Sequence, residues 1–247
     1  MMNEETILMR VDSELQRPFR GKLATENLNL HNELLAKSRD RVEAFKKKKE
    51  PVLANRTFSD EGKATAIAQL AVGSLGDFKF LNVVATREAD TADRLRKDLF
   101  TIKTPATLGA DPLLQFLFGK EIRDRYTSLT QQEKDLAFVK ASEAEGDDAQ
   151  ANRDAVLWAF QQTPGGHTIT EDLMDRALEE RARRVYPAVY AQLEQAEIMA
   201  EQVGGLRDHI VIWLRSLGAD PKTIFDALGG PLPPEPTQQR SARMVAA

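Results

Sequence analysis

The residue types that most often catalyse reactions or bind metals are few and scattered in this chain. It has no cysteine, and its three histidines, His31, His167 and His209, lie far apart in the sequence. A metal site needs several ligands brought together, and His167 has only Glu171 and Asp172 close behind it. Those acids have a structural interpretation, because negative charge stabilises the first turn of a helix. We therefore predict no metal, no cofactor and no catalytic residue.

The glycine and carboxylate patterns of common enzymes are also missing from the sequence. A phosphate-binding loop needs a second glycine five residues before its Gly-Lys pair and a Ser or Thr after it, whereas Glu121 follows Gly119-Lys120. Acidic residues mostly alternate with basic ones, as around Arg181, and we interpret these segments as solvated helix faces. The sequence thus predicts a protein that is not an enzyme. A helical enzyme with a site built from distant carboxylates and His167 is the least favoured hypothesis.

A basic segment could contact phosphate groups. Residues 37–49 end in four consecutive lysines, which are Lys46, Lys47, Lys48 and Lys49. Several lysines at a helix end can neutralise a nucleic-acid backbone, but acidic residues interrupt the segment and no aromatic residue stands among the four lysines. We favour a solvated helix end, closed by Pro51, in which the lysines oppose the negative end of the helix dipole.

Residues 206–229 resemble a helix-turn-helix in their pattern. A helix leads into a glycine turn and then into a second helix, with Ile224 and Leu228 spaced to pack inward. A recognition helix should offer polar and basic side chains to the bases, and here only Lys222 and Thr223 do so, beside two aspartates. A plain helical hairpin is the favoured interpretation, and a nucleic-acid-binding module using this hairpin is the alternative function.

Composition limits the class of protein. The chain has 247 residues, of which 42% are hydrophobic and 29% are charged, so it can bury a sizeable core and is not disordered as a whole. A net charge of −4 is unlike a general nucleic-acid coat. The N-terminus lacks the features of a signal peptide, and no apolar run approaches the roughly 18 residues of a membrane span. We expect a cytoplasmic protein with no membrane partner.

Apolar residues at helical spacing divide the chain into blocks. Breaks at 51–58, 103–111 and 163–168 separate an N-terminal block (1–104), a middle block (105–163) and a C-terminal block (164–230), followed by a proline-rich tail (231–247). Several residues mark helix starts. These are Ser59 or Asp60, Asp111 before Pro112, Thr130 with Glu133, and Thr168 with Glu171. The helix after Asp111 presents an apolar set of residues, Leu113, Leu114, Leu117, Phe118, Ile122 and Tyr126.

Two segments need a choice between interpretations. Residues 77–86 contain enough Phe and Val for a strand, but a seam of apolar residues from Phe78 to Ile102 at three- and four-residue steps favours a long helix capped by Asp77. Residues 169–203 form the longest periodic segment, which we expect to end at Gly204-Gly205. Pro187 must kink this spine helix or divide it in two.

The spine helix carries the predicted interaction surface. Its apolar stripe includes five residues that we select as partner contacts, together with the four lysines: Leu178, Val185, Val189, Leu193 and Met199. The overall prediction is an all-α, multi-helix bundle with a disordered or partner-docked tail. It would act as a structural or assembly protein, such as a virus-particle component or an assembly factor. Its partner would be another copy of itself or a larger complex, with nucleic acid less favoured. In a virus it would occupy the host cytoplasm and the particle.

Overall fold

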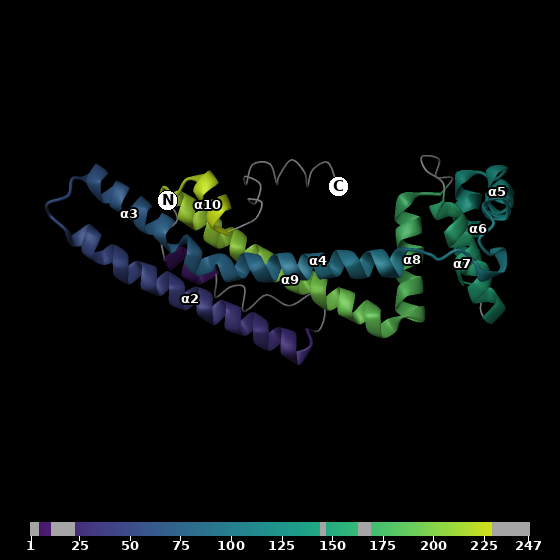
Figure 1. The fold of residues 1–247 in the computed structure, drawn as a ribbon, viewed down its shortest axis with the longest axis horizontal. Helices are drawn as coiled ribbons and strands as arrows, with labels where there is room; N and C mark the ends of the chain where they lie inside the picture. Colours follow the sequence, from purple (N-terminus) through teal and green to yellow (C-terminus); the bar gives the residue numbers. More distant parts are fainter. Residues whose placement is uncertain (1–4, 11–22, 144–146, 163–168, 229–247) are drawn as a thin grey trace. The chain divides into compact units, whose positions relative to one another are not determined.

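The computed structural model confirms the all-α fold (Figure 1). It describes residues 5–10, 23–143, 147–162 and 169–228, and among these there is no strand. Residues 5–10 are helical. The predicted capping residue Thr168, the residue His167 and the C-terminal tail lie outside the described residues. The remaining elements are α2 (Thr25–Ala54), α3 (Asp60–Ser74), the 3₁₀ helix η1 (Leu75–Phe78), α4 (Lys79–Phe100), the 3₁₀ helix η2 (Ala106–Leu108), α5 (Pro112–Thr127), α6 (Gln131–Glu143), α7 (Asp147–Gln161), α8 (Glu171–Val185), α9 (Pro187–Ser216) and α10 (Pro221–Leu228).

The chain forms two compact units. Unit 1 consists of residues 1–92 and 194–247, and unit 2 consists of residues 93–193. This division differs from the three consecutive blocks expected from the sequence, because apolar side chains of α9 and α10 share one core with those of α2, α3 and η1. Breaks in helical periodicity mark where helices end, and they do not show which helices pack together.

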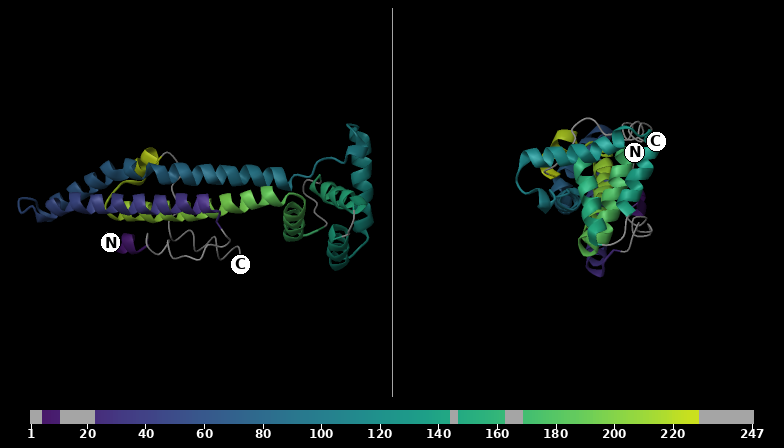
Figure 2. Two further views of the ribbon diagram at one scale, coloured as in Figure 1. Left: turned by 90° about the horizontal axis from the view of Figure 1, so that it is seen from below. Right: turned by 90° about the vertical axis from the view of Figure 1, so that its right-hand side faces the viewer.

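Unit 1 is built around Trp213, which is fully buried. The Trp213 ring of α9 meets the Phe45 ring of α2 edge-on, with ring centroids 5.0 Å apart, and the Phe78 ring of η1 at 6.3 Å. Helix α2 runs alongside the part of α9 that belongs to this unit (Figures 1 and 2). Ile224 and Leu228 of α10 are buried in the same core, as the hairpin pattern predicted.

Helix α2 continues past the proline that was expected to end it. Pro51 lies inside α2, which ends at Ala54, so the predicted stop at Pro51 is wrong and the four lysines precede the last turn. A proline this close to a helix end removes one backbone hydrogen bond to residue i−4, and the turn that follows is stabilised by side chains. The Asn55 Oδ1 atom accepts hydrogen bonds from the Thr57 amide (2.9 Å) and hydroxyl (2.6 Å). Ser59 then caps α3, accepting from the Gly62 amide at 3.1 Å.

Residues 77–86 are helical, which confirms the favoured interpretation. Asp77 is not a helix cap, however, because α3, η1 and α4 follow one another directly. Among the described helices, the stretch Asp60–Phe100 is long and apolar enough to cross a membrane by length and composition alone. This is weak evidence for a membrane span, since a core helix has the same composition. Leu75, Phe78 and Leu81 of this stretch are buried in the core of unit 1.

Pro187 divides the predicted spine helix into α8 and α9. The residue between them, Tyr186, has φ −131° and ψ 54°, so the backbone leaves the helical region there. The predicted end at Gly204-Gly205 is wrong, because α9 continues through both glycines to Ser216. Neither of these glycines has a positive φ, whereas Gly218, which follows α9, has φ +96°. Gly218 therefore closes the helix, in the glycine turn that the sequence predicted within residues 206–229, and Gly204-Gly205 does not.

Unit 2 has its own aromatic core between α5, α6, α7 and α8. The Phe160 ring of α7 meets the Tyr126 ring at 5.2 Å and the Phe138 ring at 5.8 Å, both edge-on. The predicted capping box of α6 is present: the Thr130 amide donates to Glu133 Oε2 at 2.9 Å, and the Glu133 amide donates to Thr130 Oγ1 at 3.4 Å. The Thr130 hydrogen bonds lower the pKa of the Glu133 carboxyl.

Candidate interaction surface

The predicted contact stripe is used largely by the packing of the chain itself. Leu178 is buried in the core of unit 2, Met199 is buried in the core of unit 1, and Leu193 is also buried. Val185 and Val189 are half-buried, and Val189 lines a cavity of unit 2. The structure therefore does not bring these five residues together on one exposed surface.

The predicted lysines are partly available to solvent. Lys47 and Lys48 are exposed on α2, and Lys46 and Lys49 are half-buried. The segment has no aromatic neighbour in sequence except Phe45, which points into the core. The four lysines thus remain a solvated helix face in the structure.

The two histidines within the described residues, His31 and His209, have different surroundings. His31 is buried in unit 1, and the His209 ring lies 3.3 Å from the Arg10 guanidinium. Within the described ranges, no group of three or more His, Asp or Glu residues is placed to hold a metal ion.

A different surface, on α5, carries four large exposed apolar side chains of unit 2 close together. The exposed fractions are 63% for Leu113, 51% for Leu114, 59% for Phe116 and 50% for Leu117. The opposite side of the same helix, with Gly119, Ile122 and Tyr126, is buried. We call Leu113, Leu114, Phe116 and Leu117 the α5 face.

The α5 face results from too many apolar residues in one turn. Four of the five residues from 113 to 117 are Leu or Phe, and consecutive residues on a helix point in directions about 100° apart. One helix side can be buried against α7, so the others must point to solvent. The sequence pattern included Leu113, Leu114 and Leu117 but treated them as core residues, and this crowding is the signal that could have marked them as a surface.

Close packing against α7 fixes the direction of the α5 face. A Cβ atom added at Gly119 would lie 3.4 Å from the Trp158 ring, so the glycine lets the two helices approach closely. The Arg123 guanidinium of α5 donates a 2.8 Å hydrogen bond to the Ala159 carbonyl of α7. At its start, α5 is capped by Asp111, whose carboxylate accepts from the Leu113 amide at 2.9 Å. These contacts leave α5 little freedom to rotate and bury its apolar side chains.

The charges next to the α5 face cancel. Lys120 pairs with Asp124 at 2.5 Å, and Arg125 pairs with Glu121 at 2.6 Å, both one turn apart on the helix. All four side chains are more than half exposed, so these pairs contribute little to stability. They leave the surface beside the apolar residues with no net charge.

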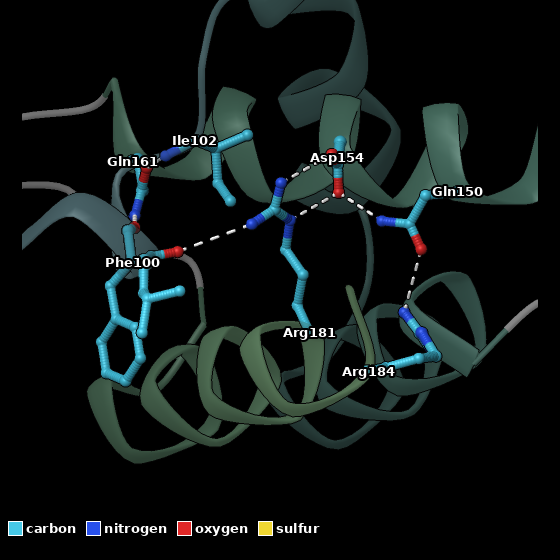
Figure 3. A network of polar contacts seen from close by, with 8 residues as sticks. Phe100, Ile102, Gln150, Asp154, Gln161, Arg181 and Arg184 are labelled. Atoms are coloured by element: carbon cyan, nitrogen blue, oxygen red, sulfur yellow. Dashed lines mark hydrogen bonds and ion pairs between the residues drawn. The ribbon is translucent and has the colours of Figure 1, made fainter. Parts of the chain in front are cut away.

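A buried polar network holds α7 and α8 in place and ties the end of α4 to them (Figure 3). Arg181, on α8, is only 7% exposed, and its Nε and Nη2 atoms donate to the two Asp154 carboxylate oxygens at 2.7 and 2.9 Å. Arg181 Nη1 lies 3.5 Å from the Leu99 carbonyl at the end of α4. The hydrogen bonds to Asp154 raise the pKa of the Arg181 guanidinium. The sequence interpretation of the Arg181 segment as a solvated face is wrong for this residue.

A second polar contact joins the segment after α4 to α7. The Gln161 side-chain amide donates to the Phe100 carbonyl, and its oxygen accepts from the Ile102 amide at 3.0 Å (Figure 3). The Phe100 carbonyl is at the end of α4 and the Ile102 amide follows that end, so these groups lack a partner within the helix. Sequence reasoning could not find this bridge, because Gln161 lies about 60 residues from both groups it satisfies.

A cavity of about 770 Å³ lies beside this network in unit 2. Apolar residues such as Leu99, Phe118 and Val189 line it, together with the charged residues Asp98, Lys103, Asp154 and Arg181. Arg181 and Asp154 are paired with each other, and Asp98 and Lys103 carry opposite charges. The lining therefore favours neither an anionic nor a cationic ligand.

No protein-family model, curated protein or solved structure matches this chain. The geometry of the two units is therefore the basis for assigning a function.

Proposed function

We propose that this chain is a helical assembly protein that acts by docking one of its helix faces onto another protein. The α5 face is the observation that carries the proposal. Four large apolar side chains within one and a half turns each expose half or more of their surface. Contiguous exposed apolar patches of a few hundred Å² commonly mark interaction sites. In this proposal the protein has no catalytic role.

A protein partner fits the α5 face better than nucleic acid or a charged membrane surface does. Binding to phosphate groups requires an excess of Lys and Arg, and the charged neighbours of the α5 face are two Lys or Arg and two Asp or Glu residues. An apolar, uncharged helix face is suited to another helix, which lays its own apolar side into it. The proposal places the protein in the cytoplasm, or in the host cytoplasm and the particle if the chain is viral.

The nucleic-acid alternative has less support from the residues of α10. Asp220 directs its carboxylate at the start of that helix, accepting from the Thr223 amide at 2.8 Å. These hydrogen bonds lower the pKa of Asp220, so it remains negatively charged near neutral pH. In a helix-turn-helix the start of α10 would face DNA, and the Asp220 carboxylate at that position would repel the phosphate groups. Lys222 is then the single basic side chain on α10.

Sedimentation of the chain in cell extract tests the proposal. We expect the tagged full chain to migrate in a density gradient well above its own 27.6 kDa, and Leu117→Lys to return it to the position of a monomer. A lysine at 117 lies one turn before Glu121, so α5 itself tolerates it. The matched control is Leu136→Lys, because Leu136 of α6 is 56% exposed in the same unit but outside the α5 face. A wild-type chain that sediments as a monomer contradicts the proposal, and a complex lost only after nuclease treatment or at high salt supports the nucleic-acid alternative.

A further inference from the structure

We propose that the partner of the α5 face is a second copy of this chain, bound with the two α5 helices antiparallel and a two-fold axis at the level of Gln115 along the helix. This inference rests on the proposed function and specifies its partner. In a two-fold contact the same patch is used on both copies. The α5 face must therefore be complementary to itself in position, area and charge.

The positions of the apolar residues suit an antiparallel pair. With the axis at the level of Gln115, Leu113 of one copy lies opposite Leu117 of the second copy, and on the two flanks Leu114 and Phe116 each lie beside the same residue of the second copy. Every exposed apolar side chain of the α5 face then meets an apolar side chain. Shifting the axis by one turn toward the C-terminus would place leucines opposite Lys120 and Glu121, which are exposed charged residues. The register is therefore set by the apolar residues.

The apolar area is close to what a stable contact needs. An aromatic side chain presents roughly 200 Å² when fully exposed, and we use this value as an upper figure for each leucine as well. The four exposed fractions, which lie between 50% and 63%, then leave roughly 400 Å² on each copy and about 800 Å² for the pair. Specific interfaces start near 1,000–1,200 Å² of total buried surface. The four side chains thus supply most of this area, and the polar side chains around them supply the remainder.

The charges near the α5 face allow two identical surfaces to meet. A surface with an excess of one charge repels its own copy, and such repulsion is used in proteins to prevent wrong pairing. Here Lys120, Glu121, Asp124 and Arg125 sum to zero and are already paired within each helix. They form a polar rim beyond the apolar residues, as in most protein interfaces.

The molar mass of the purified full chain gives the first test. We expect light scattering across a concentration series to show a mass approaching twice the 27.6 kDa of one chain. Leu117→Lys and, independently, Leu113→Gln should shift the midpoint of dimer formation at least tenfold higher in concentration, whereas Leu136→Lys should not. Circular dichroism of each variant checks that the helices remain folded. A wild-type chain that stays monomeric at every concentration overturns the inference.

Disulfide cross-linking tests the antiparallel register. The chain has no cysteine, so each introduced thiol is the only one present. We expect a mixture of Leu113→Cys and Leu117→Cys chains to form a mixed disulfide dimer under mild oxidation. Each variant alone should cross-link much less, because like residues are offset by about 6 Å along the helix axis, and a disulfide requires Cβ atoms roughly 3.5–4.5 Å apart. Efficient cross-linking of each variant with itself, or of neither combination, overturns the register.

The two proposals fail in different ways. A purified chain that is monomeric, but that migrates in extract in a complex lost in Leu117→Lys, would disprove the second copy as partner and leave the α5 face as a docking site for a different protein. A chain that is monomeric both when purified and in extract would disprove both. A dimer unaffected by Leu117→Lys and Leu113→Gln would place the contact elsewhere and overturn this inference.

Discussion

Replacing a glycine with alanine should have opposite effects on stability at two positions of unit 1. Gly205 lies inside α9, and a Cβ atom added there meets no atom within 4 Å. Gly218 follows α9 with φ +96°, and a Cβ atom added there would lie 3.1 Å from the Ala68 Cβ atom of α3. The same chemical change therefore tests two different backbone environments in one unit.

The magnitudes follow from helix propensity and backbone strain. Alanine is favoured over glycine in a helix interior by about 0.8–1 kcal/mol, so Gly205→Ala should raise the free energy of unfolding by close to that amount. A positive φ costs an L-residue roughly 1–2 kcal/mol, and the contact with Ala68 adds to this cost. Gly218→Ala should therefore lower the free energy of unfolding by about 1–3 kcal/mol. The two variants should differ by roughly 2–4 kcal/mol.

Urea unfolding followed by tryptophan fluorescence measures this difference for unit 1 alone. The chain has two tryptophans, of which Trp158 belongs to unit 2 and Trp213 to unit 1. In a Trp158→Phe background, the fluorescence reports Trp213. Equal slopes with shifted midpoints would indicate a change in stability without a change in the unfolding reaction.

One result would refute the continuous α9. If Gly205→Ala destabilises unit 1 as much as Gly218→Ala does, residue 205 needs a conformation that alanine cannot adopt. The helix would then end at Gly204-Gly205, as the sequence pattern predicted. A gain in stability at 205 together with a loss at 218 is the outcome required by a helix that continues through both glycines.

Two further predictions concern polar contacts in unit 2. Asp154→Asn should lower the free energy of unfolding by roughly 2–4 kcal/mol, because it leaves the buried Arg181 guanidinium without its counter-charge. The double variant Asp154→Leu with Arg181→Leu should recover part of this loss. Thermal unfolding followed by circular dichroism measures both effects, and an unchanged midpoint for Asp154→Asn would contradict a buried ion pair. Burial, and then a 2.6 Å hydrogen bond to Glu179, raise the pKa of the Tyr190 phenol to about 12. The unfolded chain therefore loses this proton first, and stability should fall as the pH rises from 10 toward 12. Absorbance at 295 nm should show a component titrating near pH 12 that is absent in Tyr190→Phe, and its persistence in the variant would contradict the assignment.

The sequence alone determined the all-α class and many helix starts. Capping side chains act within one turn of the chain, so Ser59, Asp111 and the Thr130–Glu133 box could be recognised without knowledge of the fold. The seam from Phe78 to Ile102 identified a helix for the same reason, since its three- and four-residue steps follow from helix geometry. These are local properties, and the structure agrees with them except at the two ends of the seam, where Phe78 belongs to η1 and Ile102 follows the end of α4.

Helix ends were less predictable when packing opposed local preference. Glycine and proline disfavour a helix by roughly 1 and 3 kcal/mol, respectively. Burial of neighbouring apolar side chains exceeds such a cost: α9 continues through Gly204-Gly205 because Met199, Val203 and Leu206 on either side are buried in one core. The glycine pair disfavours the helix locally, but the tertiary contacts outweigh this preference.

Only the tertiary structure decided which apolar residues face solvent. Periodicity placed Leu178 and Met199 on one stripe, but they belong to different helices, α8 and α9, and each is covered by the core of its own unit. It likewise groups Leu113 and Leu117 with the buried Ile122, although close packing at Gly119 turns the first two outward. Helical spacing depends on neighbours in sequence, whereas exposure depends on which distant segments pack against the helix, and the candidate interaction surface is therefore a property of the fold.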